Sequence, residues 1–206
     1  MISEEEQKRI LGELKDIFQE KNLNLLVLGS IAVHYRLGPV GKTKDIDVRP
    51  FPIDDKFDVY WDKLEEITEE INGNLNIETG GSTITLLGRI EEMDVTIELI
   101  DAGGEKFLTK KVIDDMIDTA DRIEGVFVPS LEHIVVSKAE AYLDRTEGDL
   151  SKEKYWEDLI RIRKKLKEKG LTLDREEIER VVKLRPERKI EDLLRILNRY
   201  LFEVVD

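Results

Sequence analysis

The chain has no cysteine and only two histidines, His34 and His133, among its 206 residues. The lack of cysteine excludes a disulfide scaffold, a thiolate metal site and a cysteine nucleophile, and two histidines are too few for a histidine-rich zinc site. No apolar run approaches the roughly 18 residues of a membrane span, and the acidic N-terminus does not resemble a signal peptide. From these absences we expect a soluble, cytoplasmic protein with no membrane partner.

Charge is abundant but unevenly distributed. The formal net charge is −13 and the isoelectric point about 4.8. Residues 1–150 hold 17 basic and 33 acidic residues (net −16), whereas residues 151–206 hold 16 basic and 13 acidic ones (net +3). Such an acidic chain is not expected to follow a long nucleic-acid track. A basic run leaves contact with a tRNA end open, the alternative being a solvated helix face; the run comprises Arg161, Arg163, Lys164, Lys165, Lys167 and Lys169.

The order of apolar patterns predicts an α+β fold. We expect a mixed β-sheet with flanking helices over residues 1–128, and a helical domain over residues 129–206 where the net charge changes sign. Proline residues at 50 and 52 are expected to stop the second strand. The predicted helices cover 3–20, 30–37, 55–71, 109–119, 129–144, 151–170, 174–184 and 187–203, and the predicted strands 25–28, 45–48, 75–79, 83–88, 92–100 and 126–128.

Three features in the first hundred residues point to chemistry. The first is Gly29-Ser30, at the junction between a predicted strand and a predicted helix that Ser30 would cap. Glycine allows close approach of a ligand to the backbone, and a helix N-terminus offers free N–H groups to an anion. The alternative is an ordinary serine cap after a turn.

The second feature is the pair Asp45 and Asp47. Residues two apart on a strand point to the same face, and two adjacent carboxylates repel each other unless a cation lies between them. Oxygen-only sites of this kind suit Mg²⁺, with substrate phosphates completing the coordination. A solvent-facing strand end in a very acidic chain is the alternative.

The third feature is Asp94, in a strand whose other face carries Met93, Val95 and Ile97. A third carboxylate on a neighbouring strand could complete a two-metal site and accept a proton from an attacking hydroxyl. Glu98 is the rival, and because it lies about 13 Å further along at ~3.3 Å per residue, only one of the two can share the site. We favour Asp94.

These features resemble the nucleotidyltransferase superfamily of the DNA polymerase β type. The signature is an apolar strand, Gly-Ser, a short helix and a Thr-x-Asp-x-Asp strand, here LVLGSIAVHYRLGPVGKTKDIDVRP over residues 26–50. Two later segments are similar to the small prokaryotic branches: VPSLEHIVVSKAEAYLDR, in which Pro129 precedes a helix with Lys138, and KYWEDLIRI, in which Asp158 is the matching acid. The resemblance implies a nucleotidyltransferase-like mixed sheet followed by a helical lobe.

The resemblance also implies roles for individual residues. Asp45 and Asp47 would hold two Mg²⁺ ions, and Asp94 would ligate one of them and act as the base. Gly29 and Ser30 would bind the β- and γ-phosphates of a nucleoside triphosphate (NTP), which Lys138 would also reach. The reaction is in-line attack of a hydroxyl on the α-phosphorus with release of pyrophosphate.

The acceptor and the partners stay open at this stage. Small relatives modify tRNA ends, proteins or small hydroxylated compounds such as aminoglycosides, and some are toxins paired with an antitoxin. The alternative function is a catalytically silent nucleotide-binding or toxin-antitoxin-type interaction protein of the same fold. His133 is expected to be structural. His34, one turn into the helix after Gly29, is expected to be a packed or surface residue, the alternative being that it approaches the nucleotide. The residues flanking the acids either contact phosphates or balance charge; these are Lys42, Lys44 and Arg49.

Overall fold

The computed structural model describes residues 4–39, 46–52, 74–77, 83–90, 93–100, 109–145 and 150–202, with the backbone alone between 74 and 100. The predicted helix at 55–71 and the candidate ligand Asp45 lie outside these residues. In the described part of the chain, no helix is both long and apolar enough to cross a membrane.

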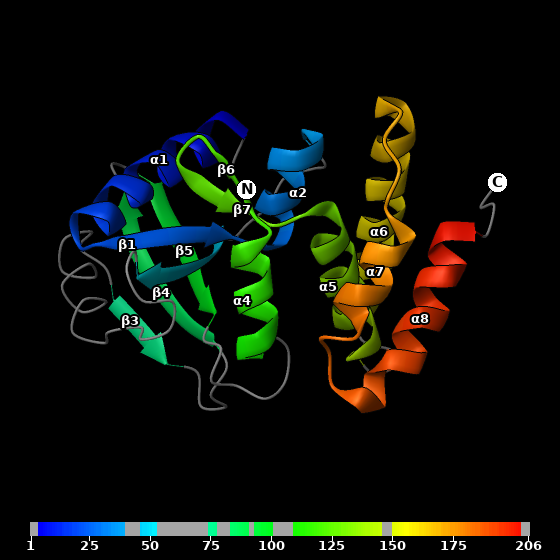
Figure 1. Ribbon diagram of the computed structural model, residues 1–206. Coiled ribbons are helices and arrows are strands. Elements are labelled where there is room, and N and C mark those ends of the chain that lie inside the picture. Colours follow the sequence, from blue (N-terminus) through cyan, green and yellow to red (C-terminus); the bar gives the residue numbers. More distant parts are fainter. Residues whose placement is uncertain are drawn as a thin grey trace.

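A seven-stranded mixed sheet forms one part of the molecule (Figure 1). Its strand order is β3-β4-β5-β2-β1-β7-β6, and β2 pairs with β5, and β1 with β7, in parallel, while the other neighbours are antiparallel. The strands are β1 (Leu23–Val27), β2 (Ile46–Pro52), β3 (Asn74–Ile77), β4 (Thr83–Ile90), β5 (Met93–Ile100), β6 (Asp121–Ile123) and β7 (Val126–Val128).

Helices flank this sheet and then form a helical lobe, as the sequence predicts. In Figure 1 the helices α5 to α8 gather on one side of the sheet, with α2 and α4 between them and the strands. The helices are α1 (Glu4–Glu20), α2 (Gly29–Leu37), α4 (Lys110–Asp118), α5 (Leu131–Leu143), α6 (Leu150–Lys169), α7 (Arg175–Val182) and α8 (Glu187–Phe202).

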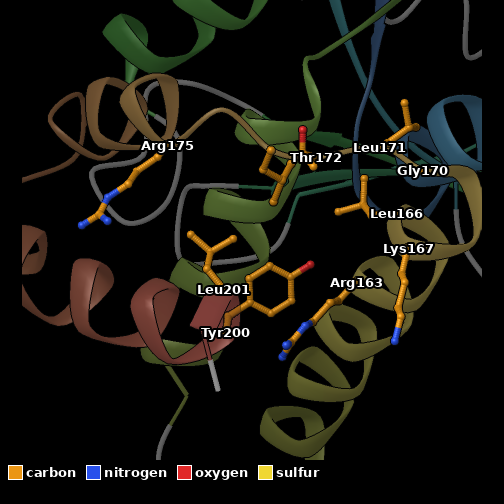
Figure 2. Close-up of a pocket in the computed structure, with 10 residues that line it drawn as sticks. Arg163, Leu166, Lys167, Gly170, Leu171, Thr172, Arg175, Tyr200 and Leu201 are labelled. Carbon is orange, nitrogen blue, oxygen red and sulfur yellow. The ribbon is translucent and has the colours of Figure 1, made fainter. Parts of the chain in front are cut away.

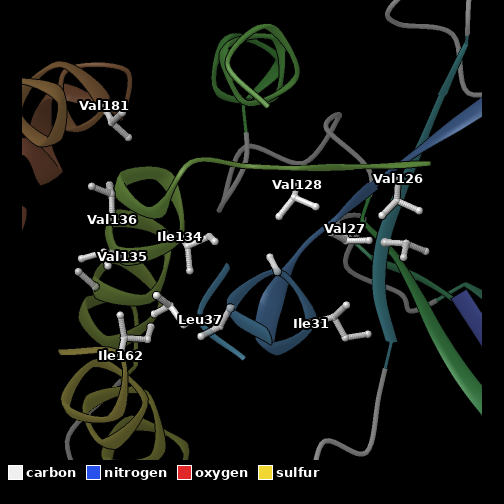
Figure 3. Packing of buried hydrophobic residues seen from close by; sticks show 14 of the residues in the cluster. Val27, Ile31, Leu37, Val126, Val128, Ile134, Val135, Val136, Ile162 and Val181 are labelled. Atoms are coloured by element: carbon white, nitrogen blue, oxygen red, sulfur yellow. The ribbon is translucent and has the colours of Figure 1, made fainter. Parts of the chain in front are cut away.

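One buried apolar cluster joins the sheet to the helical lobe (Figure 3). It contains Val27 of β1 and Ile31 of α2, and continues through Val135 of α5 to Ile162 of α6 and Val181 of α7. All five side chains are at most 2% exposed. Because burial of this kind stabilises a fold by roughly 25 cal/mol per Å² of apolar surface, the lobe and the sheet support each other across residue 128. The division at that residue stays a prediction.

Three helix ends after residue 128 are predicted correctly. Ser130 caps α5 by accepting a hydrogen bond from the His133 N–H at 3.2 Å. Asp174 caps α7 by accepting from the N–H groups of Glu176 and Glu177 at 2.8 and 3.2 Å. Gly170, which follows α6, has the left-handed conformation of a helix stop, with φ +64°. These signals are local, so the sequence carries them fully.

The prediction that Pro50 and Pro52 end the second strand is wrong. β2 continues to Pro52, and both prolines lie opposite residues of β1. The pairing of β2 with β5 runs only from Ile46 to Val48. Beyond Val48 one side of β2 carries no paired strand among the described residues, so a residue without an N–H is tolerated there as it is on an edge strand.

Strand β6 is absent from the sequence-based prediction. It has three residues, two of them exposed and charged, and its backbone pairs with β7 from Asp121 to Ile123. Such a short polar segment has no apolar alternation to reveal it.

Candidate active site

The turn between β1 and α2 brings Gly29 against Asp47. Gly29 has φ +56°, and a Cβ built on it would lie 1.7 Å from Oδ2 of Asp47. The Leu28 N–H donates to the Asp47 carbonyl oxygen at 2.9 Å, which fixes the turn to β2. Only glycine fits this position, since any side chain would displace the carboxylate.

The first turn of α2 lies directly beside this carboxylate. Leu28 is the N-cap residue, and its carbonyl oxygen accepts the first helical hydrogen bond from Ala32 N–H at 3.1 Å. The expectation that Ser30 caps the helix is therefore wrong, because Ser30 already lies inside the first turn. The turn contains no acidic residue and Leu28 makes no side-chain cap. The helix therefore presents N–H groups and its positive dipole end beside Asp47.

The sheet register decides which acid lies next to Asp47. In the parallel pairing of β2 with β5, Asp47 is opposite Glu98. Asp94 is four residues earlier on β5, where it pairs with Arg89 of β4, and this separation corresponds to about 13 Å along a strand. Paired positions share a face of the sheet, so the backbone favours Glu98 over Asp94 as the neighbour of Asp47.

Lys138 and Asp158 form a buried ion pair. Lys138 Nζ donates to Asp158 Oδ2 at 2.7 Å, and the two side chains are 10% and 15% exposed. The Lys138 ammonium also lies 5.5 Å from the ring centre of Tyr155, within the range of a cation–π contact. A guanidinium nitrogen of Arg161 is 3.8 Å from the other Asp158 oxygen. The fold thus joins two residues twenty positions apart that the sequence resemblance singles out separately.

Helix α2 connects the two parts of this region. It packs against β2 and against α5 and α6, and Figure 3 shows Leu37 of α2 on the side of Ile134 and Ile162, with Ile31 on the side of Val27. Because α5 and α6 carry Lys138 and Asp158, the same helix that begins at Gly29 supports the ion pair.

Arg36, near the end of α2, anchors the helix to the entrance of the helical lobe. Its guanidinium donates to the carbonyl oxygens of Val128 and Pro129, both at 2.7 Å, and pairs with Asp121. Two buried carbonyl groups are thereby satisfied at the β7–α5 junction. Sequence reasoning missed this residue, and the only signal was a basic side chain in the last turn of a helix.

His133 lies in a charged cluster that ties α4, α5 and α7 together. The ring is fully buried, and its Nε2 lies 2.7 Å from Asp115 Oδ2. Arg180 binds the same carboxylate through two nitrogens at 2.5 and 2.7 Å, and also pairs with Glu177. Since Asp115 only accepts hydrogen bonds when ionised, Nε2 of a neutral His133 carries the proton and donates.

The pKa values of this cluster follow from burial and charge. Burial, helped by the nearby Arg185 and Arg180 charges, lowers the pKa of His133 to about 4 despite its bond to Asp115. Burial raises the pKa of Asp115, but hydrogen bonds from Arg180 and His133 outweigh it, so this pKa is below its usual value. The histidine is therefore neutral and structural, as predicted.

A second buried charged network stabilises the helical lobe. Glu140 pairs with Arg185 at 2.8 Å and with Lys189 at 2.9 Å, and Lys189 also reaches Asp144 at 2.7 Å. Burial raises the pKa of Glu140 and lowers that of Arg185. Arg185 donates in addition to the Ser137 hydroxyl at 3.0 Å. Opposite charges thus lie next to one another between α5 and the segment that leads into and begins α8, and we assign this network to the packing of the lobe.

The remaining candidate residues near the acids are either buried or outside the described part of the chain. His34 and Arg49 are buried, at 7% and 2% exposure, and Lys42 and Lys44 lie outside the described residues. Where the structure places side chains, it contains no group of three or more His, Asp or Glu arranged for a metal ion. Asp45 is outside that part, and Asp94 and Glu98 are located by backbone register.

A strand–glycine–helix turn facing an acidic strand of a mixed sheet is the arrangement of nucleotidyltransferase-like folds. The chain belongs to the family described as nucleotidyl transferase of unknown function (DUF2204), which it matches over residues 7–199. This result confirms the superfamily resemblance seen in the sequence.

Solved structures with a similar fold agree with this assignment. An antigenic nucleotidyltransferase-like protein from Paracoccidioides brasiliensis superposes with a TM-score of 0.59 at 17% identity, covering 96% of this chain and 89% of the other. ANT(2″)-Ia in complex with adenylyl-2″-tobramycin gives a TM-score of 0.55 at 20% identity, covering 94% and 98%. At such identities the likeness concerns the fold. No protein of curated function matches the chain.

Proposed function

We propose that this protein transfers a nucleoside monophosphate from an NTP to an acceptor hydroxyl, with Mg²⁺ as the metal and pyrophosphate as the leaving group. The observation that carries the proposal is the Asp47 carboxylate held against Gly29 at the first turn of α2. A helix N-terminus attracts phosphate, and a carboxylate beside it provides a ligand for the cation that accompanies phosphate.

The donor set fits Mg²⁺. Asp45 and Asp47 are two residues apart, and Glu98 is the register partner of Asp47, so the candidate ligands are carboxylate oxygens, which Mg²⁺ prefers. Asp45, Asp47 and a third carboxylate would hold the two ions. When bound, the metal neutralises phosphate charge and activates the phosphorus for attack.

For the third carboxylate we propose Glu98 in place of Asp94. The support is the pairing of Asp47 with Glu98 across β2 and β5. A carboxylate there would accept the proton of the attacking hydroxyl, as a general base does. Asp94 is the alternative that the experiment below distinguishes.

The chain's own groups have defined tasks in the transfer. The acceptor oxygen bonds to the α-phosphorus while the bond from that phosphorus to the pyrophosphate oxygen breaks, and the hydroxyl proton passes to the third carboxylate. Backbone N–H groups at Gly29 and Ser30 and the Ser30 hydroxyl would hold the β- and γ-phosphates. Lys138 would reach the triphosphate by exchanging Asp158 for a phosphate oxygen.

For the acceptor we propose a small, polyhydroxylated and positively charged compound. The support is twofold: residues 1–150 carry a net charge of −16, which attracts cations, and a protein of similar fold is seen with adenylyl-2″-tobramycin. In the basic run, Arg161 pairs with Glu157 and Lys165 with Glu168. Because these charges are already balanced by acidic neighbours, the basic run gives little support to RNA as the acceptor. The cytoplasm, which supplies NTPs, is the expected compartment.

The test measures pyrophosphate release from ATP, GTP, CTP and UTP with Mg²⁺ or with EDTA. Acceptors are tobramycin, total RNA and a protein extract, and α-³²P-labelled nucleotide shows which one is modified. Metal-dependent release with label on a small acceptor is the expected result. NTP binding without release for every acceptor would instead favour the catalytically silent alternative, and absence of NTP binding would contradict both.

Variants assign the carboxylates. Asp47→Asn and Glu98→Gln are each expected to lower the rate by about 100-fold or more, while Asp94→Asn has a smaller effect. Glu191→Gln, an exposed acid on α8, is the matched control and should leave the rate unchanged. The opposite order for Asp94 and Glu98 would contradict the assignment of Glu98.

A further inference from the structure

A cavity of about 610 Å³ lies in the helical lobe (Figure 2). Its lining comes from the second half of α6, the loop that follows, the first residue of α7 and the end of α8. The volume is in the range of small-molecule sites. None of the groups proposed for catalysis lines it.

The charged residues that line the cavity are all basic. Arg163, Lys167 and Arg175 are lining residues, and among the described lining residues none is acidic. Arg175 also pairs with Glu179 at 3.3 Å, so its charge is partly balanced, while Lys167 is exposed. In a chain of net charge −13, this local excess of cations selects for an anion.

The wall of the cavity is aliphatic. Leu166, Leu171 and Leu201 line it, and Leu171 is one of the two large apolar side chains that the described structure leaves exposed, at 43%. An apolar ligand that covered these leucines would gain from burial of their surface. Figure 2 shows Leu166 near Arg163 and Lys167, and Leu201 beside Tyr200, whereas the Arg175 side chain extends away from them.

Tyr200 adds a polar group without a partner. The residue is 2% exposed, and its hydroxyl has no hydrogen-bond partner in the described structure. Figure 2 shows the phenol next to Arg163 at the cavity. A buried hydroxyl that makes no hydrogen bond is costly. After a small shift of the side chains that cover it, the Tyr200 hydroxyl would donate a hydrogen bond to an anionic group held by Arg163.

We propose that this pocket binds a small organic anion, in which one carboxylate or phosphate head is attached to an aliphatic body. Arg163 and Lys167 bind the head, and the leucines contact the body. The same charges repel polycationic compounds, so the ligand differs from the acceptor proposed for the transfer reaction. The inference stands independently of that reaction.

Calorimetric titration of the full chain with five probes separates the contribution of the charged head to binding from that of the aliphatic body. Octyl phosphate and octanoate carry both parts, octanol only the body, inorganic phosphate only the head, and octylammonium the opposite charge. We expect the first two to bind at least ten-fold more tightly than the other three, and the tighter of them identifies the head. Equal affinity for octanol and octyl phosphate would overturn the proposal.

Variants locate the binding. Arg163→Gln with Lys167→Gln should weaken binding of octyl phosphate by five-fold or more and leave octanol unaffected, whereas Arg195→Gln, at a side chain 78% exposed on α8, should change neither. Tyr200→Phe should weaken binding about three-fold without lowering the melting temperature of the free protein, because the hydroxyl it removes has no partner. A double variant that binds octyl phosphate like the wild type would overturn the proposal.

Discussion

The Asp47 carboxylate occupies the space in which a side chain on Gly29 would begin. A Cβ on Gly29 would lie 1.7 Å from Oδ2 and 2.7 Å from Cγ of Asp47. The Asp47 side chain can therefore occupy its position only if residue 29 is a glycine. The first turn of a helix and a carboxylate are thus held side by side by a steric requirement, before any ligand arrives.

Replacement of Gly29 by alanine tests this relationship. The alanine would carry both a positive φ and a collision, so we expect the free energy of unfolding to fall by about 2–4 kcal/mol, with loss of NTP binding. Gly170→Ala is the matched control, because Gly170 has φ +64° and nothing within 4 Å of its Cβ, and should cost about 1 kcal/mol. Urea unfolding measures both, and equal losses would show that the collision is relieved without cost.

Variants can separate the contribution of the Lys138–Asp158 pair to stability from its contribution to nucleotide binding. Asp158→Asn leaves a buried ammonium without its partner and should lower stability by about 3 kcal/mol. Lys138→Met should cost less, because Arg161 lies near the remaining carboxylate.

A double variant then isolates the nucleotide-binding role. Lys138→Met with Asp158→Leu should recover most of the stability, since apolar groups replace both charges, yet still bind NTP at least ten-fold more weakly than the wild type. Urea unfolding and NTP titration provide the two readouts. Normal NTP affinity in the double variant would remove Lys138 from the triphosphate site.

Acid sensitivity should come in large part from His133. Its pKa is about 4 when folded, against 6.5 for an ordinary histidine, so between these pH values the unfolded chain binds more protons and stability falls as pH falls. The loss amounts to roughly 3 kcal/mol over the window. The lowered pKa of Asp115 acts in the same direction at still lower pH.

His133→Gln should flatten this part of the pH profile, because no group at that position then takes up a proton on unfolding. Unfolding free energies measured by urea at intervals from pH 4 to pH 7 provide the comparison. The wild-type chain, measured under the same conditions, is the control. An unchanged slope in the His133 variant would contradict the assignment.

Replacement of Arg36 should lower the free energy of unfolding far more than replacement of its exposed partner Asp121. Arg36→Met leaves the carbonyl groups of Val128 and Pro129 without their donor, and we expect a loss of about 2–3 kcal/mol. Asp121→Asn removes only an ion-pair partner that is 69% exposed, and should cost less than about 1 kcal/mol. Thermal and urea unfolding of the two variants decide the point; similar losses would mean that the ion pair, rather than the carbonyl contacts, provides the anchor.

The glycine turn, the strand of Asp47 and two helix caps could be predicted from the sequence because their signals are local. Gly29-Ser30 follows an apolar run, Asp45 and Asp47 have strand spacing, and the caps at Ser130 and Asp174 are encoded within four residues. The predicted N-cap of α2 is wrong because a contact with another strand overrides the local pattern. Ser30 has the side chain of a cap, but the helix begins after Leu28, whose N–H is hydrogen-bonded to the Asp47 carbonyl oxygen.

The choice between Asp94 and Glu98 shows the limit of such reasoning. Both acids lie on the same strand at even spacing, so alternation alone cannot rank them. The answer depends on which residue of β5 pairs with Asp47, and that register joins segments about fifty residues apart. A register is set by packing of the whole sheet.

The sequence by itself determined the class of fold, the glycine turn, the acidic strand and the helix ends, because each depends on the conformational preferences and apolar periodicity of a few adjacent residues. Tertiary structure alone decided the strand order, the partner of Asp47, the Lys138–Asp158 pair, the Arg36 anchor and the cationic cavity. These depend on side chains that are distant in sequence and meet only when a common apolar core is buried, and no short stretch of the chain contains that information.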